Sequence, residues 1–119
     1  MITRRTLLFA PLARPRRIAL TIDDFNPAVL ASDNAAEANR RFLKYLDRAG
    51  LEAAAFVIGG VNQSAERRAD LEAWSQAGHR IANHTWSHRN YNNPGVTGPE
   101  FAADAARAHG FVSSFRTFT

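Results

Sequence analysis

A chain of 119 residues has room for one compact domain but not for two. Hydrophobic residues make up 45% of it and charged residues 22%, which is the composition of a globular protein rather than a disordered one. No apolar run approaches the ~20 residues that a membrane-spanning helix needs, and the absence of cysteine excludes disulfides and thiolate metal sites.

The net charge of +4 is concentrated at the start of the chain. The first seventeen residues hold five arginines and no acidic residue, namely Arg4, Arg5, Arg14, Arg16 and Arg17. Beyond them ten of the fifteen basic residues remain, against eleven acidic ones, so the rest is close to neutral. A nucleic-acid surface needs its positive charge on the folded body. We therefore expect no nucleic-acid partner.

Residues 1–16 form a basic arm that has two interpretations. Its paired arginines ahead of a short apolar stretch resemble a twin-arginine export signal, which would direct the protein to the periplasm or outside the cell. The stretch contains Pro11 and is followed at once by basic residues, so a disordered tail of a cytoplasmic protein explains it equally well. The folded domain is expected to occupy residues 17–119.

Strand-like and helix-like segments alternate along this domain. The sequence RIALTID, residues 17–23, is mostly apolar and β-prone, as is typical of a strand buried on both faces. A helix is predicted from Asn34 to Ala49. Asn34 and Glu37 have the spacing of a capping box, and Gly50 suits the C-terminal stop. The apolar face of this helix would consist of Phe42, Leu43 and Leu46.

A second strand and helix follow. AAAFVIGG, residues 53–60, is predicted to be an apolar strand that ends in glycines. Ser64 would then cap a helix that carries Leu71 and Trp74 on its apolar side. Gly78 would end that helix.

The alternation occurs a third time. HRIAN, residues 79–83, is predicted to be a short strand, and Thr97 and Glu100 have the capping-box spacing that would open a third helix, which Gly110 would end. This order of elements predicts an α/β fold with parallel strands. In such folds functional side chains gather where the strands end.

Polar residues follow two of the three strands directly. Asp23 and Asp24 end the first strand, and His84 and His88 follow the third. Two histidines at this spacing would share one face of a helical turn and converge on an ion. A catalytic zinc site adds a carboxylate as third ligand and leaves a fourth position for water. A second adjacent acid would be free to take a proton from that water.

Each cluster also has an ordinary explanation. The acids would serve equally well in a turn or as a helix cap, and the histidine pair as structural residues. His79 and His109 are interpreted as structural or solvated, and Trp86 is expected to pack beneath its loop. Asn83 and Asn90 would orient the histidines, although the polarity of the loop accounts for their presence equally well. Only the combination at two strand ends favours a metal site.

Three segments, IALTIDDF, AAFVIGG and GHRIANHTWSH, resemble the first half of the polysaccharide deacetylases, the NodB-homology domain of carbohydrate esterase family 4. The first motif of that family reads T-F-D-D-G, against Thr21-Ile22-Asp23-Asp24-Phe25 in this chain. The second motif reads H-S/T-x-x-H, and residues 84–88 match each defined position. The resemblance covers residues 17–90.

This resemblance implies a distorted TIM-type β/α barrel, here incomplete with three β/α units, that removes acetyl groups from N-acetylated or O-acetylated polysaccharide. Asp23 would be the general base. Asp24, His84 and His88 would hold a divalent metal, usually zinc, which would polarise the acetyl carbonyl and activate water. Thr85 would brace the loop through its hydroxyl. Such a ligand set also accepts cobalt, nickel or ferrous iron.

The chain departs from the family pattern in two places. Phe25 replaces the motif glycine, which would put a bulky side chain beside the base. After His88 we find no Arg-Pro-Pro motif, no Asp/Trp motif and no final histidine to protonate the leaving amine; FRTFT at residues 115–119 has only a faint likeness to the first of these. Loss of that acid alone costs about 10²–10⁴ in rate.

We therefore expect a truncated domain with weak or no activity. The last strand of its sheet would lack a neighbour, and apolar surface would stay uncovered. The alternative is a non-catalytic fragment of the same fold that binds carbohydrate or metal.

Overall fold

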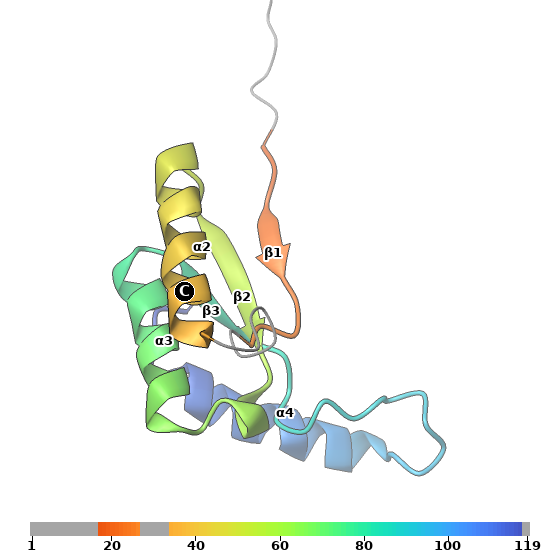
Figure 1. Ribbon diagram of the computed structural model, residues 1–119. Helices are drawn as coiled ribbons and strands as arrows, with labels where there is room; N and C mark the ends of the chain where they lie inside the picture. Colours follow the sequence, from red (N-terminus) through yellow and green to blue (C-terminus); the bar gives the residue numbers. More distant parts are fainter. Residues whose placement is uncertain (1–16, 27–33, 118–119) are drawn as a thin grey trace, which may run out of the picture.

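The computed structural model describes residues 17–26 and 34–117, so the basic arm of residues 1–16 lies outside the described residues. The elements are β1 (Leu20–Ile22), α2 (Ala35–Ala49), β2 (Ala53–Val57), the 3₁₀ turn η1 (Gly59–Val61), α3 (Ala65–Gln76), β3 (Arg80–Asn83) and α4 (Gly98–Val112) (Figure 1). The predicted alternation of strands and helices is confirmed. None of the described helices is long and apolar enough to cross a membrane.

The strands form one parallel sheet in the order β1-β2-β3. Leu20 of β1 pairs with Ala53, and Arg80 of β3 pairs with Ala54. Because all three strands run in the same direction, their carboxyl ends lie at one edge of the sheet. The turn after β1 and the loop after β3 therefore emerge side by side at the strand tips (Figure 1).

The core lies between one face of this sheet and the helices α2 and α3. Ala53, Ala55 and Val57 of β2 alternate along the strand toward this face, and all three are buried. Leu71 and Trp74 of α3 have no exposed surface, as the apolar pattern predicted. The core cluster is completed by Leu46 of α2, Ile81 of β3, Phe25, and Phe111 and Val112 of α4.

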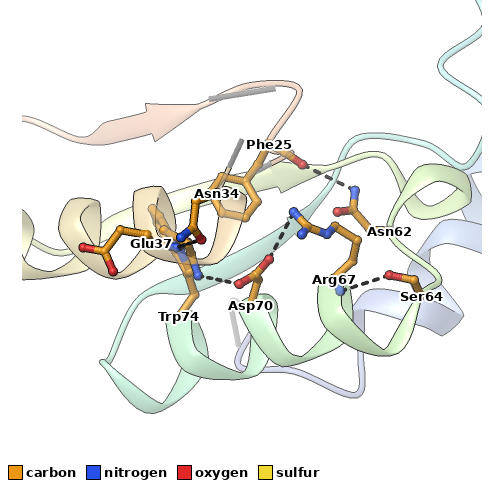
Figure 2. A network of polar contacts seen from close by, with 9 residues as sticks. Phe25, Asn34, Glu37, Asn62, Ser64, Arg67, Asp70 and Trp74 are labelled. Atoms are coloured by element: carbon orange, nitrogen blue, oxygen red, sulfur yellow. Dashed lines mark hydrogen bonds and ion pairs between the residues drawn. The ribbon is translucent and has the colours of Figure 1, made fainter. Parts of the chain in front are cut away.

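The helices begin at the positions that their capping residues predicted. The Asn34 and Ser64 side chains each accept a hydrogen bond from the backbone N–H three residues further on (Figure 2). Thr97 and Glu100 form a reciprocal capping box. Gly50 closes α2 with a φ of 63°, in the left-handed region that glycine adopts at little cost.

The end predicted for the third helix is wrong. α4 continues through Gly110 to Val112. Phe111 and Val112 are both buried in the core cluster. Their burial is worth about 1.5–3 kcal/mol for each side chain, which exceeds the roughly 1 kcal/mol that glycine costs inside a helix.

The first strand is shorter and more exposed than predicted. β1 begins at Leu20, because Leu20 pairs with Ala53 and that residue is the first of β2. Ile18, which was expected inside a strand buried on both faces, is 86% exposed. β1 is thus an edge strand, and the expectation of burial on both faces is wrong.

The outer edge of β3 is partly paired, contrary to the expectation that the last strand lacks a neighbour. The Ile81 N–H donates to the carbonyl of Arg116 at 2.8 Å, and Arg80 Nη1 donates to the carbonyl of Thr117 at 2.9 Å. The ring of Phe115 packs on Phe111 with centroids 5.5 Å apart. Residues 115–117 therefore return along this edge and contribute to the core.

A buried polar network joins α2 to α3 (Figure 2). Trp74 Nε1 donates to Asn39 Oδ1 at 2.6 Å, and Asn39 Nδ2 donates to Asp70 Oδ1 at 3.1 Å. Arg67 Nη1 lies 3.2 Å from the other oxygen of Asp70. Burial raises the pKa of Asp70, and the Arg67 guanidinium and the Asn39 amide oppose that rise. The network therefore holds α2 against α3.

Candidate metal centre

The turn after β1 presents Asp24 at the strand tips because Phe25 anchors it. Phe25 is 2% exposed, and its ring meets the Trp74 ring edge-on at 4.6 Å. Its N–H donates to the Phe56 carbonyl at 3.0 Å, and its own carbonyl accepts from Asn62 Nδ2 at 3.4 Å (Figure 2). The expectation that Phe25 crowds the base is wrong, because this apolar ring is buried in the core.

His84 and His88 lie in the loop after β3 and not on a helical turn. The two rings nevertheless stack, with centroids 5.0 Å apart and planes 29° apart. The loop turns back on itself at Thr85 and His88, whose φ angles are 64° and 54°. Thr85 Oγ1 accepts a hydrogen bond from the His88 N–H at 3.1 Å. The two histidines therefore lie together as predicted, but for a different reason: the loop reverses direction and the Thr85 hydroxyl holds it in that conformation.

Residues with a left-handed backbone conformation cluster at this edge of the sheet. Asp24, Thr85 and His88 are the only non-glycine residues with positive φ in the part of the chain that the structure describes. Each such residue costs about 1–2 kcal/mol, and the β-branched Thr85 is especially disfavoured there. Backbone strain of this kind persists only where surrounding contacts hold it, and it is typical of functional sites.

Asp24, His84 and His88 form a compact group of potential ligands. Asp24 Oδ1 lies 3.0 Å from His84 Nε2 and 3.1 Å from His88 Nε2. One ligand atom from each of the three residues lies within 4.8 Å of the others. Bonds of about 2.0–2.2 Å in a tetrahedral zinc site separate ligand atoms by roughly 3.4 Å. The two distances from Asp24 Oδ1 to the histidine nitrogens, 3.0 and 3.1 Å, are close to this separation.

The group is open to solvent on one side. The side chains of His84, Asp24 and His88 are 28%, 59% and 52% exposed. Asp23 is exposed in the same turn and makes no hydrogen bond or ion pair with the other described residues. A fourth coordination position and a free carboxylate would therefore both face the solvent. The roles assigned to these four residues from the sequence stay predictions.

The loop is held on both sides by its neighbours. Asn83 Oδ1 accepts from the Thr85 N–H, and Asn83 Nδ2 donates to the Ala105 carbonyl, both at 2.8 Å. The N–H groups of Gly59 and Gly60 donate to the carbonyls of Thr85 and Trp86 at 3.0 and 2.8 Å. Asn83 thus ties the loop to α4, while η1 supports its carbonyl groups.

Trp86 packs beneath the loop, as expected. Its indole ring meets the Phe111 ring edge-on at 6.3 Å, and the Arg107 guanidinium lies 3.8 Å from the centre of the indole ring. Asn90 Oδ1 accepts from the Asn92 N–H at 2.9 Å and so serves a local turn. These contacts stabilise the chain between the two histidines and just after the second one.

The two remaining histidines are not part of this group. His79 is buried at the opposite end of β3, where its Nδ1 accepts a hydrogen bond from the Ala53 N–H at 3.3 Å. Burial lowers the pKa of His79, although the nearby Glu52 carboxylate opposes this. His109 is exposed near the end of α4. Both positions agree with the structural or solvated roles assigned to them.

Asp104 on α4 was not predicted from the sequence as a residue of this site. Its Oδ2 accepts from the N–H groups of Trp86 and Ser87 at 2.9 and 3.0 Å, and its Oδ1 accepts from Ser87 Oγ at 2.7 Å. The sequence did contain a signal for it. Asp104 lies four and seven residues before the apolar Ala108 and Phe111, so in a helix it shares their face, and both are buried. A lone acid on the buried side of a helix requires hydrogen-bond partners.

A parallel β/α sheet with a histidine and carboxylate cluster at its carboxyl edge defines an α/β class in which ligands bind at the strand tips. The family model described as polysaccharide deacetylase matches residues 12–115. The chain belongs to the polysaccharide deacetylase family. No curated protein matches it.

Solved structures share the fold. The Bc1960 peptidoglycan N-acetylglucosamine deacetylase superposes with a TM-score of 0.64 at 21% identity, over 82% of this chain and 40% of that one. The T48 deacetylase, solved with substrate, gives 0.59 at 22% identity, over 82% and 43%. The Xyl-CE4 domain of a multidomain xylanase from the hindgut metagenome of Trinervitermes trinervoides gives 0.58 at 20% identity, over 82% and 44%.

This chain spans less than half the length of each of these proteins. Its three strands and the helices around them therefore form an incomplete barrel of the NodB type, as the resemblance implied.

Proposed function

We propose that this chain carries the metal centre of a polysaccharide deacetylase and acts on acetylated polysaccharide. One observation supports this most strongly. A single carboxylate oxygen of Asp24 lies 3.0 and 3.1 Å from the Nε2 atoms of His84 and His88, although 60 residues separate the turn from the loop. The family to which the chain belongs supplies the reaction class.

Asp24, His84 and His88 would hold a divalent metal, most often zinc. Two imidazole nitrogens and one carboxylate oxygen are donors that zinc accepts in catalytic sites with a fourth, open position. Cobalt, nickel and ferrous iron accept the same donors. When bound, the ion would act as a Lewis acid toward the acetyl carbonyl and lower the pKa of a water.

Asp23 would act as the general base. Its carboxylate is exposed next to Asp24, so it can accept a proton from the attacking water. The water oxygen adds to the acetyl carbon, the bond from that carbon to the sugar nitrogen or oxygen breaks, and acetate leaves. The departing group needs a proton, and neither the buried His79 nor the exposed His109 belongs to the group formed by Asp24, His84 and His88. We therefore expect slow acetate release from these 119 residues alone.

Calorimetric titration with zinc tests the metal site. We expect the unsubstituted chain to bind one zinc ion, and His84→Ala to weaken binding by more than the ~10–100-fold that loss of an outer-shell partner costs. His109→Ala removes an exposed histidine elsewhere and serves as the matched control, with no change expected. Equal zinc affinity in His84→Ala and the unsubstituted chain would refute the metal site.

Acetate release then separates an enzyme from a binding fragment. The zinc-loaded chain is incubated with an N-acetylglucosamine oligomer and, in parallel, with acetylated xylan. An enzyme releases acetate slowly and loses this activity in Asp23→Asn while zinc affinity is retained. The second candidate function, a carbohydrate- or metal-binding fragment without turnover, predicts zinc binding and no acetate above the metal-free blank.

A further inference from the structure

The segment between the two candidate histidine ligands is held by one carboxylate. Both oxygens of Asp104 accept hydrogen bonds from this segment: two from the N–H groups of Trp86 and Ser87 and one from the Ser87 hydroxyl. Asp104 lies on α4, 17 and 18 residues further along the chain. A helix that contributes no candidate ligand therefore holds the loop that contributes two.

The backbone N–H and carbonyl groups of this loop are not paired within a helix or strand, so they need other hydrogen-bond partners. Its carbonyl groups at Thr85 and Trp86 are bonded by η1, whereas its N–H groups at Trp86 and Ser87 depend on Asp104. Hydrogen bonds to an ionised acceptor are roughly twice as strong as those between neutral groups. Loss of this carboxylate would leave two backbone donors and one hydroxyl without their acceptor.

The two histidines depend on Asp104 to different degrees. His84 directly follows β3, and its N–H donates to the Val57 carbonyl at 3.1 Å, so the sheet itself positions it. His88 follows Ser87 directly and has a left-handed φ of 54°. The contacts that hold this conformation are Thr85 Oγ1 on its own N–H and Asp104 on the residue before it.

We propose that Asp104 is a positioning residue for the candidate ligand His88, acting through the backbone of Trp86 and Ser87. The proposal rests on the proposed metal centre. Although partial burial opposes it, the hydrogen bonds from Ser87 and Trp86 hold the pKa of Asp104 below its ordinary value. The acceptor is thus an ionised carboxylate, and an amide in its place would offer one acceptor oxygen and turn an NH₂ group toward the loop donors.

The first test uses the metal-free protein and is independent of the proposed function. Amide hydrogen exchange is measured at Trp86 and Ser87 in the unsubstituted chain and in Asp104→Asn. We expect these amides to exchange at least about tenfold faster in the variant, because they lose hydrogen bonds to a charged group. Glu100→Ala is the matched control, because it removes the capping box of the same helix and touches no loop donor. It is expected to lower the thermal midpoint and to leave both exchange rates unchanged.

The second test reads the coordination sphere with cobalt(II), whose visible absorption spectrum depends on the number and geometry of its ligands. Asp104→Asn is expected to bind cobalt about 10–100-fold more weakly. Its spectrum should approach that of His88→Ala and differ from that of His84→Ala. A merely structural role would lower stability in Asp104→Asn, as in Glu100→Ala, without this spectral change.

Two outcomes overturn the inference: unchanged exchange at Trp86 and Ser87 in Asp104→Asn, or an unchanged cobalt spectrum despite faster exchange. If the unsubstituted chain binds no cobalt or zinc, the proposed metal centre fails, and with it the role of Asp104 toward His88. The exchange rates still decide in that case whether Asp104 orders the loop, so the two failures are distinguishable.

Discussion

Replacing Phe25 with alanine tests whether this motif position belongs to the core or to the substrate site. Phe25 is 2% exposed and packs edge-on against Trp74 at 4.6 Å, within the cluster that joins α2, α3 and the sheet. Truncating a buried phenylalanine costs about 3–5 kcal/mol, because transfer free energy is lost and a cavity remains. A small domain has a free energy of unfolding of about 5–15 kcal/mol. Phe25→Ala should therefore remove a large part of the stability.

Urea unfolding followed by far-ultraviolet circular dichroism measures the change. Phe25→Leu keeps most of the volume and should cost less than about 1.5 kcal/mol, so it remains measurable if Phe25→Ala does not fold. Tyr45→Ala truncates an aromatic side chain that is 58% exposed, and as a control it should stay within about 0.5 kcal/mol of the unsubstituted chain. Equal unfolding midpoints for Phe25→Ala and Tyr45→Ala would refute the assignment of Phe25 to the core.

Two further predictions concern backbone space and pH. A Cβ at Gly60 would lie 2.7 Å from the Trp86 carbonyl oxygen, so Gly60→Ala should lower the free energy of unfolding by about 1–3 kcal/mol. A Cβ at Gly110, inside α4, would meet nothing within 4 Å, so Gly110→Ala should raise the free energy of unfolding by about 0.5–1 kcal/mol. If urea unfolding shows changes of the same sign for the two variants, this interpretation of the two glycines is contradicted. Burial lowers the pKa of His79 in the folded chain. As the pH falls below about 6.5, the ordinary histidine pKa, the unfolded chain therefore binds this proton before the folded chain does. The free energy of unfolding should decrease as the pH falls below that value. His79→Asn should flatten this decline below about pH 6.5 relative to His109→Asn, and an unchanged slope would exclude His79 as its cause.

The helix starts could be read from the sequence because their causes are local. Asn34, Ser64 and Thr97 each bond a backbone N–H three residues away, so the residue types and their spacing suffice to predict the caps. Glycine predicted the helix ends less well than the capping residues predicted the helix starts. Gly50 ended its helix as predicted, whereas Gly110 did not, because the next two residues are buried by contacts far away in the sequence.

The candidate site could be read in part for the same reason. Acids after one strand and histidines after another lie at the same edge of a parallel sheet, so a carboxylate, His84 and His88 were predicted as a group without knowledge of the loop that joins them. The choice of Asp24 over Asp23 as the third member came from the resemblance to the deacetylase motif. The helical turn expected between the histidines was wrong, because Thr85 and His88 reverse the chain through left-handed backbone. Such conformations are stabilised by tertiary contacts, and sequence spacing does not reveal them.

The sequence by itself determined the alternation of elements, the parallel sheet and the residues that meet at its carboxyl edge, because local hydrogen bonds and hydrophobic periodicity act over a few residues. Only the tertiary structure placed Phe25 in the core, Arg116 along the edge of β3 and Asp104 under the histidine loop. Each of these depends on partners 17 or more residues away. Packing and hydrogen-bond satisfaction across the folded chain decide such contacts.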